Sequence, residues 1–193
     1  MKGNLLKKVI SCVLGATMVT SMFVTGFSFA SAEVGYINLD RTNFKITVPS
    51  AYGSNPSTYM PDGNKSTIWE TDWSQGSTQL PAEILVDMGE VKENVSRVIY
   101  TPRQTDVNGK IKDYKVYAGE TTDDMQLVSE GSWDWGSTNT EIAAKIDDAY
   151  ADFDIPVNAR YIKILVESAT TKPPDPNQTI TCAELNIAVE GEV

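Results

Sequence analysis

The sequence predicts an all-β fold, a sandwich of short strands with loops at its ends. Apolar and polar residues alternate with period two in several short runs, as they do in half-buried strands. Each run is bounded by Gly, Pro, Asn or Asp, which favour turns. No window has the pattern of a long amphipathic helix, and the nearest candidate, Thr140 to Ala151, is thinly apolar. These three observations together indicate a β-sandwich.

The predicted strands follow one another along the chain. Their alternating apolar positions are Ile84, Val86 and Met88; Tyr114 and Val116; Ile162, Ile164 and Val166; and Leu185, Ile187 and Val189. Around residues 84–86 and 162–166 apolar residues fall on both faces, which predicts central strands that are covered on both sides. Residues 50–78, 101–110 and 168–181 are polar and rich in Gly, Pro and Asn, so we expect them to be the functional loops.

Residues 1–32 have the pattern of a secretory signal peptide. Three lysines precede an apolar stretch from Val9 to Phe29, and Ala30-Ser31-Ala32 offers a cleavage site. That site argues against an uncleaved membrane anchor, and Cys12 lies too early in the segment for a lipoprotein. We therefore expect a secreted protein whose mature chain, residues 33–193, forms one domain. The short lysine-headed signal indicates a bacterial source.

The charge of the chain restricts its partners. The formal net charge is −10 and there is no histidine. Cleavage after Ala32 would also remove three lysines, so nucleic acid and anionic membranes are poor partners. Cys182 would be the only cysteine left, which excludes an internal disulfide and predicts a small core residue. The acidic stretch from Asp147 to Asp154 is expected to be a solvated loop.

The most informative stretch is residues 62–73, which read Asp-Gly-Asn-Lys-Ser-Thr-Ile-Trp-Glu-Thr-Asp-Trp. Side chains with oxygen donors come first and two tryptophans follow. This is the combination that a hard cation beside a sugar would need. From the spacing alone, a metal site and a simple turn capped by Asp62 explain the Asp62-Gly63 pair equally well.

Further short motifs follow in a fixed order. They are Pro81 to Gly89, Tyr100 to Gln104, Asn108-Gly109, Tyr114 to Tyr117, Gly131 to Trp133, Arg160 to Ile164 and Ala183 to Asn186. With residues 62–73, this order resembles the discoidin-like F5/8 type C domains, and most of all the family 32 carbohydrate-binding modules, over residues 47–189. The resemblance implies a jelly-roll β-sandwich of the galactose-binding-domain type. It also implies a sugar site in the loops at one end and one structural calcium.

The resemblance assigns the calcium ligands. Asp62 and Glu184 would bind through their side chains and Thr67 through its hydroxyl or carbonyl oxygen. The remaining ligands would be the backbone carbonyls of Tyr59, Asn64 and Ala183. An all-oxygen shell of this kind suits calcium, which would tie the loop to the last strand.

The resemblance also assigns a sugar site. Trp73 would be the platform against the C–H face of the ring, Arg103 and Asn108 would bind hydroxyl groups, and Glu70 would be the polar residue of the first loop. Trp69 and Trp133 are instead expected in the core, the usual place for a tryptophan.

Two of these assignments have structural alternatives. Arg103 could be paired with a carboxylate at the edge of the core such as Asp87, and Asn108 could simply form the Asn-Gly turn. The chain also departs from the galactose-binding members, which typically have histidine where Glu70 stands. In addition, residues 168–181 lack the second aromatic wall that many members have, although Lys172 could reach the site. The sugar therefore stays open among galactose, N-acetylgalactosamine, N-acetylglucosamine and an amino sugar.

Catalysis is not expected. The chain has no histidine, no Gly-x-Ser-x-Gly motif and no room for a catalytic domain beside the sandwich. The sequence therefore predicts a secreted, calcium-stabilised, non-catalytic and monomeric protein that binds terminal sugars of glycans. The alternatives are an adhesin-like domain that binds protein and an accessory module that acts beside a glycoside hydrolase.

Overall fold

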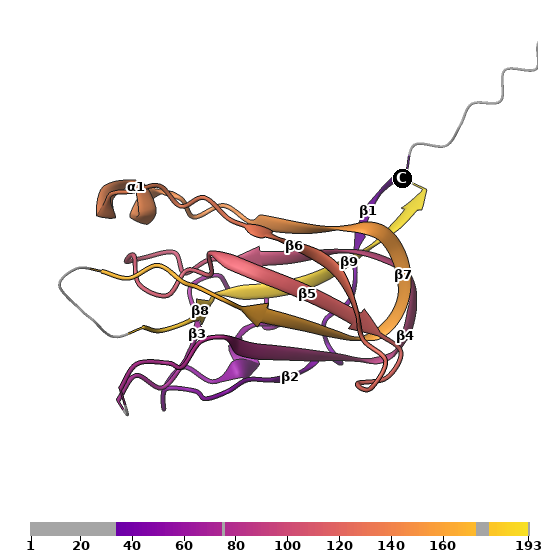
Figure 1. The fold of residues 1–193 in the computed structure, drawn as a ribbon, viewed down its shortest axis with the longest axis horizontal. Coiled ribbons are helices and arrows are strands. Elements are labelled where there is room, and N and C mark those ends of the chain that lie inside the picture. Colours follow the sequence, from indigo (N-terminus) through magenta and orange to yellow (C-terminus); the bar gives the residue numbers. More distant parts are fainter. Residues whose placement is uncertain (1–33, 75, 173–177, 193) are drawn as a thin grey trace, which may run out of the picture. The chain divides into compact units, whose positions relative to one another are not determined.

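The computed structural model describes residues 34–74, 76–172 and 178–192 (Figure 1). The predicted signal peptide, residues 1–32, lies outside the described residues. Residues 32–193 group into one compact unit. Within the described part of the chain, no helix is both long and apolar enough to cross a membrane.

In the described part of the chain, nine strands form two antiparallel sheets. The large sheet contains β1 (Val34–Asn38), β2 (Lys45–Thr47), β4 (Ala82–Thr101), β5 (Asp113–Gly119), β6 (Gln126–Ser132), β7 (Ala149–Val166) and β9 (Glu184–Glu192). Its order is β1-β9-β4-β7-β5-β6, with β2 paired to β4. The small sheet pairs β3 (Trp69–Glu70) with β8 (Thr181–Cys182).

The large sheet folds over into two layers because β4 and β7 are long and bent (Figure 1). The first part of β4 pairs with β2 and with the end of β7, and its last part pairs with β9 and with the beginning of β7. Register shifts between Asp87 and Arg97 mark the bend, where Gly89 has a φ of 87° that side chains rarely adopt. The predicted all-β sandwich is confirmed.

The apolar positions of the predicted strands face the space between the layers. Ile84, Val86, Ile162 and Ile164 are all fully buried. The two central strands lie inside the sheet as predicted, because β4 and β7 each have neighbours on both sides. The expectation that they are covered on both faces is wrong, since Leu85 is only half-buried. Leu85 stands opposite Lys163, so charged neighbours share its outer face.

Aromatic side chains fill the loop end of the core. Tyr100 is fully buried and stacks on Trp133, with ring centroids 4.9 Å apart. Trp135, which the sequence reading missed, packs edge-on against Tyr100, and its indole nitrogen donates to the Ile111 carbonyl at 2.6 Å. Trp69 is also fully buried, so both tryptophans that were predicted to be structural are in the core.

Cys182 and the acidic stretch from Asp147 to Asp154 differ in how well they follow the prediction. Cys182 is buried, which confirms it as a core residue, and burial raises the pKa of its thiol well above the usual value. The expected acidic loop is partly wrong, because Asp152 and Asp154 lie on the exposed face of β7. Asp152 is ion-paired there with Arg97.

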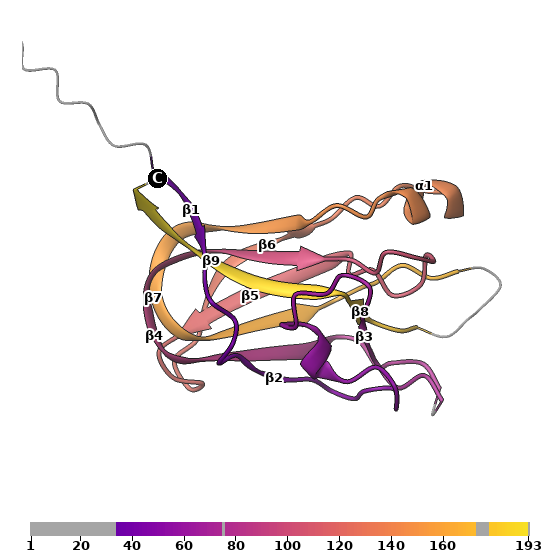
Figure 2. The same cartoon turned by 180° about the vertical axis from the view of Figure 1, so that it is seen from behind.

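The helical segments are short. Among the described residues they are the 3-10 helix η1 (Ser57–Tyr59) and the helix α1 (Asn139–Ala144), which overlaps the thinly apolar segment from Thr140 to Ala151. Figures 1 and 2 show α1, β3 and β8 at one end of the domain and the final residues of β9 at the other. The loops that connect the layers at the α1 end form the candidate site.

Candidate functional site

Three loops that were predicted to be functional are joined by backbone hydrogen bonds. The Thr71 nitrogen donates to Ile180 at 3.0 Å, and the Thr181 nitrogen donates to Gly109 at 2.7 Å. Gly109 is required for this contact, since its φ is +82° and a Cβ would lie 2.8 Å from a methyl carbon of Thr181. The fold thus brings the described parts of residues 70–78, 101–110 and 168–181 to one place.

An ion pair between two of these loops is the centre of the predicted sugar site. Glu70, at the end of β3, lies 3.5 Å from the Arg103 guanidinium, and the side chains are only 13% and 14% exposed. The Asn55 amide also donates to Glu70, at 3.1 Å. The alternative partner for Arg103 is wrong, because Asp87 is bound through both of its oxygens by Arg160, at 2.8 and 2.9 Å.

The Arg103 guanidinium also donates hydrogen bonds to backbone carbonyls of its own loop. Its Nε donates to the Thr105 carbonyl at 2.7 Å, and one terminal nitrogen donates to the Asn108 carbonyl at 3.3 Å. The side-chain oxygen of Asn108 accepts a hydrogen bond from the backbone nitrogen of Lys172 at 2.6 Å. Asn108 therefore does more than form the Asn-Gly turn, because it also joins its loop to the late loop.

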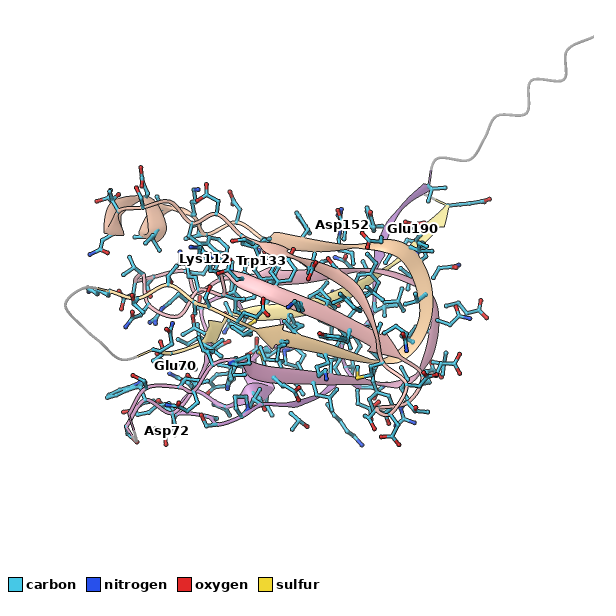
Figure 3. All side chains as sticks on the ribbon, in the orientation of Figure 1. Glu70, Asp72, Lys112, Trp133, Asp152 and Glu190 are labelled. Carbon is cyan, nitrogen blue, oxygen red and sulfur yellow. The ribbon has the colours of Figure 1, made fainter. Side chains whose placement is uncertain are left out.

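Trp73 presents an aromatic face beside this polar group. It is 40% exposed and stacks on Tyr52, with ring centroids 4.7 Å apart and an angle of 19° between the planes. Asp72 accepts hydrogen bonds from the Ser74 backbone and hydroxyl, which fixes the turn around Trp73. In Figure 3, Glu70 and Asp72 lie at the loop end, whereas Asp152 and Glu190 lie towards the other end.

Tyr52 and Asn55 are contributions that the sequence reading missed. They come before η1 and the predicted metal loop in the sequence, and the backbone nitrogen of Tyr52 donates to the Glu70 carbonyl at 2.8 Å. The signal was present as an aromatic and an amide in the polar segment 50–78, but nothing local indicated which residues they would meet.

The predicted metal loop lies next to this site in the sequence and is built by local hydrogen bonds. Asp62 accepts from the Asn64 nitrogen at 2.7 Å and from the Thr67 hydroxyl at 2.8 Å. The Asn64 carbonyl accepts from the Thr67 nitrogen at 3.0 Å. Burial raises the pKa of Asp62, but these hydrogen bonds outweigh burial and lower it overall. The Tyr59 carbonyl accepts from the Asp62 nitrogen at 3.3 Å, which closes the turn.

Glu184, at the start of β9, reaches this loop from the other end of the sequence. One of its oxygens accepts from the Gly63 nitrogen at 3.2 Å and from Arg41. Burial and the nearby carboxyl of Asp62 raise the pKa of Glu184. Ala183 is buried just before it and donates its N–H to the Thr101 carbonyl at 2.9 Å.

The predicted oxygen set fits a calcium ion by its chemistry. The other oxygen of Glu184 is buried and has no hydrogen-bond partner among the described residues, which is costly for a carboxylate unless a cation satisfies it. Two facing carboxylates beside hydroxyl and carbonyl oxygens form a hard, all-oxygen set. The described ranges hold no group of three or more His, Cys, Asp or Glu side chains suited to a metal. Neutral oxygens would therefore have to supply the remaining ligands.

Solved structures share this fold. The chain has a TM-score of 0.64 and 27% identity with the family 32 carbohydrate-binding module of NanJ from C. perfringens, solved with galactose, covering 79% of this chain and 98% of that one. It has the same TM-score, at 23% identity, with another family 32 module from Clostridium perfringens that was solved with GalNAc-β-1,3-galactose. That match covers 78% of this chain and 99% of the other.

Relatives with known names are larger proteins. The chain is 36% identical over 109 residues, 55% of its length, to the A type blood N-acetyl-alpha-D-galactosamine deacetylase of Flavonifractor plautii. It is 29% identical over 161 residues, 82% of its length, to the galactose oxidase of Gibberella zeae. The matched regions span only 14% and 21% of those proteins. The family model for the F5/8 type C domain matches residues 45–185, and the chain therefore belongs to the F5/8 type C domain family.

Proposed function

We propose that this domain is a non-catalytic module that binds terminal sugars of glycans through Trp73, Glu70, Arg103 and Asn108. The observation that carries the proposal is the exposed indole of Trp73, stacked on Tyr52, on the same loop as Glu70, which is paired with Arg103. An exposed tryptophan normally exposes apolar area at a cost, which is offset when a ligand covers it. A sugar ring matches this arrangement because it has a C–H face and a rim of hydroxyl groups.

The polar part of the site suits a neutral sugar. Arg103 carries N–H donors in a planar fork, and Glu70 supplies carboxylate oxygens, so vicinal hydroxyls could meet both donors and acceptors. Glu70 would repel the carboxylate of a uronic acid. Galactose, N-acetylgalactosamine and N-acetylglucosamine are the candidates, and the galactose-bound NanJ module, at 27% identity, supports the first of them.

A structural calcium is part of the same proposal. Asp62, Thr67 and Glu184 would hold it with the carbonyls of Tyr59, Asn64 and Ala183, and the unpaired oxygen of Glu184 supports this assignment. The ion would supply positive charge between the two carboxylates. The residues themselves keep the loop that precedes β3 attached to the start of β9.

Secretion and a role beside an enzyme complete the proposal. Secretion is supported by the lysine-headed apolar segment and the Ala30-Ser31-Ala32 site of the sequence. The accessory role is supported by the relatives, since galactose oxidase and the sialidase of Micromonospora viridifaciens match this chain over only 21% and 16% of their lengths. A module of this kind would hold a catalytic partner near its glycan.

A glycan array with the wild type and Trp73→Ala tests the function. The wild type should bind glycans that end in galactose or an N-acetylhexosamine, with a Kd of about 0.1 to 1 mM for one sugar, because few atoms are buried. Loss of the indole should reduce binding at least about tenfold, a change of about 1.4 kcal/mol.

Leu127→Ala is the matched control. Leu127 is also a large, exposed apolar side chain, at 49% exposure, but it lies on β6. This variant should bind like the wild type. Absence of binding to every glycan, or equal binding by Trp73→Ala, would remove the proposed function and leave the fold unaffected.

A further inference from the structure

A hollow of about 620 Å³ lies between α1, the loop at residues 106–107 and the start of the late loop. Val107, Thr140, Ala143 and Ala144 line part of it. The charged residues Asp106 and Lys172 line another part. The size is within the range of pockets that take small ligands. Nothing in the terminal-sugar site described above uses these residues.

The wall that α1 provides is held in place from below. Thr138 and Glu141 form a capping box at the start of α1, and Ile142 is buried. The ammonium group of Lys110, which is fully buried, donates to the carbonyls of Ile142 and Lys145 at 2.6 and 2.7 Å. These contacts satisfy carbonyls at the end of the helix, which would otherwise lack partners. The exposed Ala143 and Ala144 are therefore presented on a fixed support.

The loop that lines one side of the hollow also carries part of the proposed sugar site, because Asp106 and Val107 directly precede Asn108. Arg103 donates to the Asn108 carbonyl, and the Asn108 side chain accepts from the Lys172 nitrogen. The Lys172 ammonium group then lies 3.5 Å from Asp106. A row of polar contacts thus leads from the Glu70–Arg103 pair to the hollow.

The chemistry of the hollow suits a neutral ring with hydroxyl groups. The exposed side chains of Ala143 and Ala144 provide a small apolar surface, and a ring could lie against it with its C–H face. Asp106 and Lys172 offer an acceptor and a donor whose charges offset each other. A charged sugar would pair with only one of these two side chains and would leave the other without its partner.

We propose that this hollow is a second subsite, which takes the neutral sugar that follows the terminal one in the glycan, a hexose or an N-acetylhexosamine. The inference rests on the proposed function, because it needs a terminal sugar at Trp73. The preferred ligand of the domain is then a disaccharide unit rather than a single sugar.

Titration calorimetry with matched sugars tests the second subsite. The probes are galactose, N-acetylgalactosamine and N-acetylglucosamine, and then lactose, GalNAc-β-1,3-galactose and N,N′-diacetylchitobiose, which end in these sugars. We expect at least one disaccharide to bind about tenfold more tightly than its terminal sugar. Ala143→Trp, which fills the hollow from an exposed position, should remove this advantage and leave the monosaccharide affinity near that of the wild type.

Two controls separate the outcomes. Leu127→Trp adds the same bulk on β6 and should keep the disaccharide advantage, and melting curves will show whether Ala143→Trp is folded. Lys172→Ala, which keeps the backbone contact to Asn108, should weaken only disaccharide binding, by about threefold. Equal binding of each disaccharide and its terminal sugar by the wild type would overturn the second subsite alone. No binding of any probe would overturn the proposed function and the second subsite with it.

Discussion

The candidate metal loop and the candidate sugar loop are neighbours in the sequence but are stabilised differently. In the metal loop, Asp62 and Asn64 make hydrogen bonds within five residues. Glu184 contacts this loop from a distant part of the sequence. In the sugar loop, Glu70 is paired with Arg103, and Trp73 rests on Tyr52. The first loop leaves one buried oxygen unsatisfied, whereas the second leaves an aromatic face exposed. A cation would satisfy the former and a ring the latter.

The largest effect should come from removing the long-range member of the metal loop. Glu184→Gln leaves Arg41 without its carboxylate at a site where Glu184 is 5% exposed, so the unfolding free energy should fall by about 3 kcal/mol. Urea unfolding measures this. Glu83→Gln is the control, because Glu83 pairs with Lys163 at 3.3 Å but is 59% exposed, and it should cost less than about 1 kcal/mol. Equal losses would mean that Glu184 is an ordinary surface group.

Calcium itself should act through the same residue. A free concentration about one hundred times the Kd should stabilise the wild type by about 2.7 kcal/mol, since binding to the folded state alone shifts the unfolding equilibrium. Melting temperatures with calcium and with excess chelator measure the effect. Glu184→Gln should respond much less than the wild type. An unchanged wild-type melting temperature would contradict the calcium assignment.

The difference between the loops also explains how much could be predicted from the sequence. Asp62, Asn64 and Thr67 lie within six residues, so their shared orientation follows from one turn, and the strand alternation followed from burial in the same local way. The partner of Arg103 did not follow, because Asp87 was the carboxylate considered, whereas the fold placed β3 and Glu70 beside that loop. Tyr52 and Lys110 act through contacts 21 and 32 residues away along the chain, which no local pattern shows.

Substitutions in the sugar loop should change the affinity for sugar more than the free energy of unfolding. Arg103→Lys keeps the charge but loses the planar fork, so the affinity for the array-selected sugar should fall about tenfold, or 1.4 kcal/mol. Arg160→Lys is the control, since Arg160 is likewise paired with a carboxylate, in its case through two nitrogens, but lies on the sheet. It should leave the affinity unchanged. If both variants bind like the wild type, Arg103 does not contact the sugar.

The Asp87–Arg160 pair also gives the smallest and most specific prediction, because it serves as a reference outside both loops. Hydrogen bonding from Arg160 holds the pKa of Asp87 below its usual value of 3.8, although partial burial opposes this. A lowered pKa in the folded state means that the pair stabilises the protein above pH 3.8, and that this contribution is lost as the pH falls through the folded-state value. The melting temperature of Asp87→Asn should therefore lie below that of the wild type at pH 6, and the difference should shrink towards pH 2. A constant difference would show that Asp87 acts by packing rather than by charge. Sugar affinity at pH 6 should be the same in both proteins, because this ion pair stabilises the sheet and lies outside the proposed sugar site, which contains the Glu70–Arg103 pair.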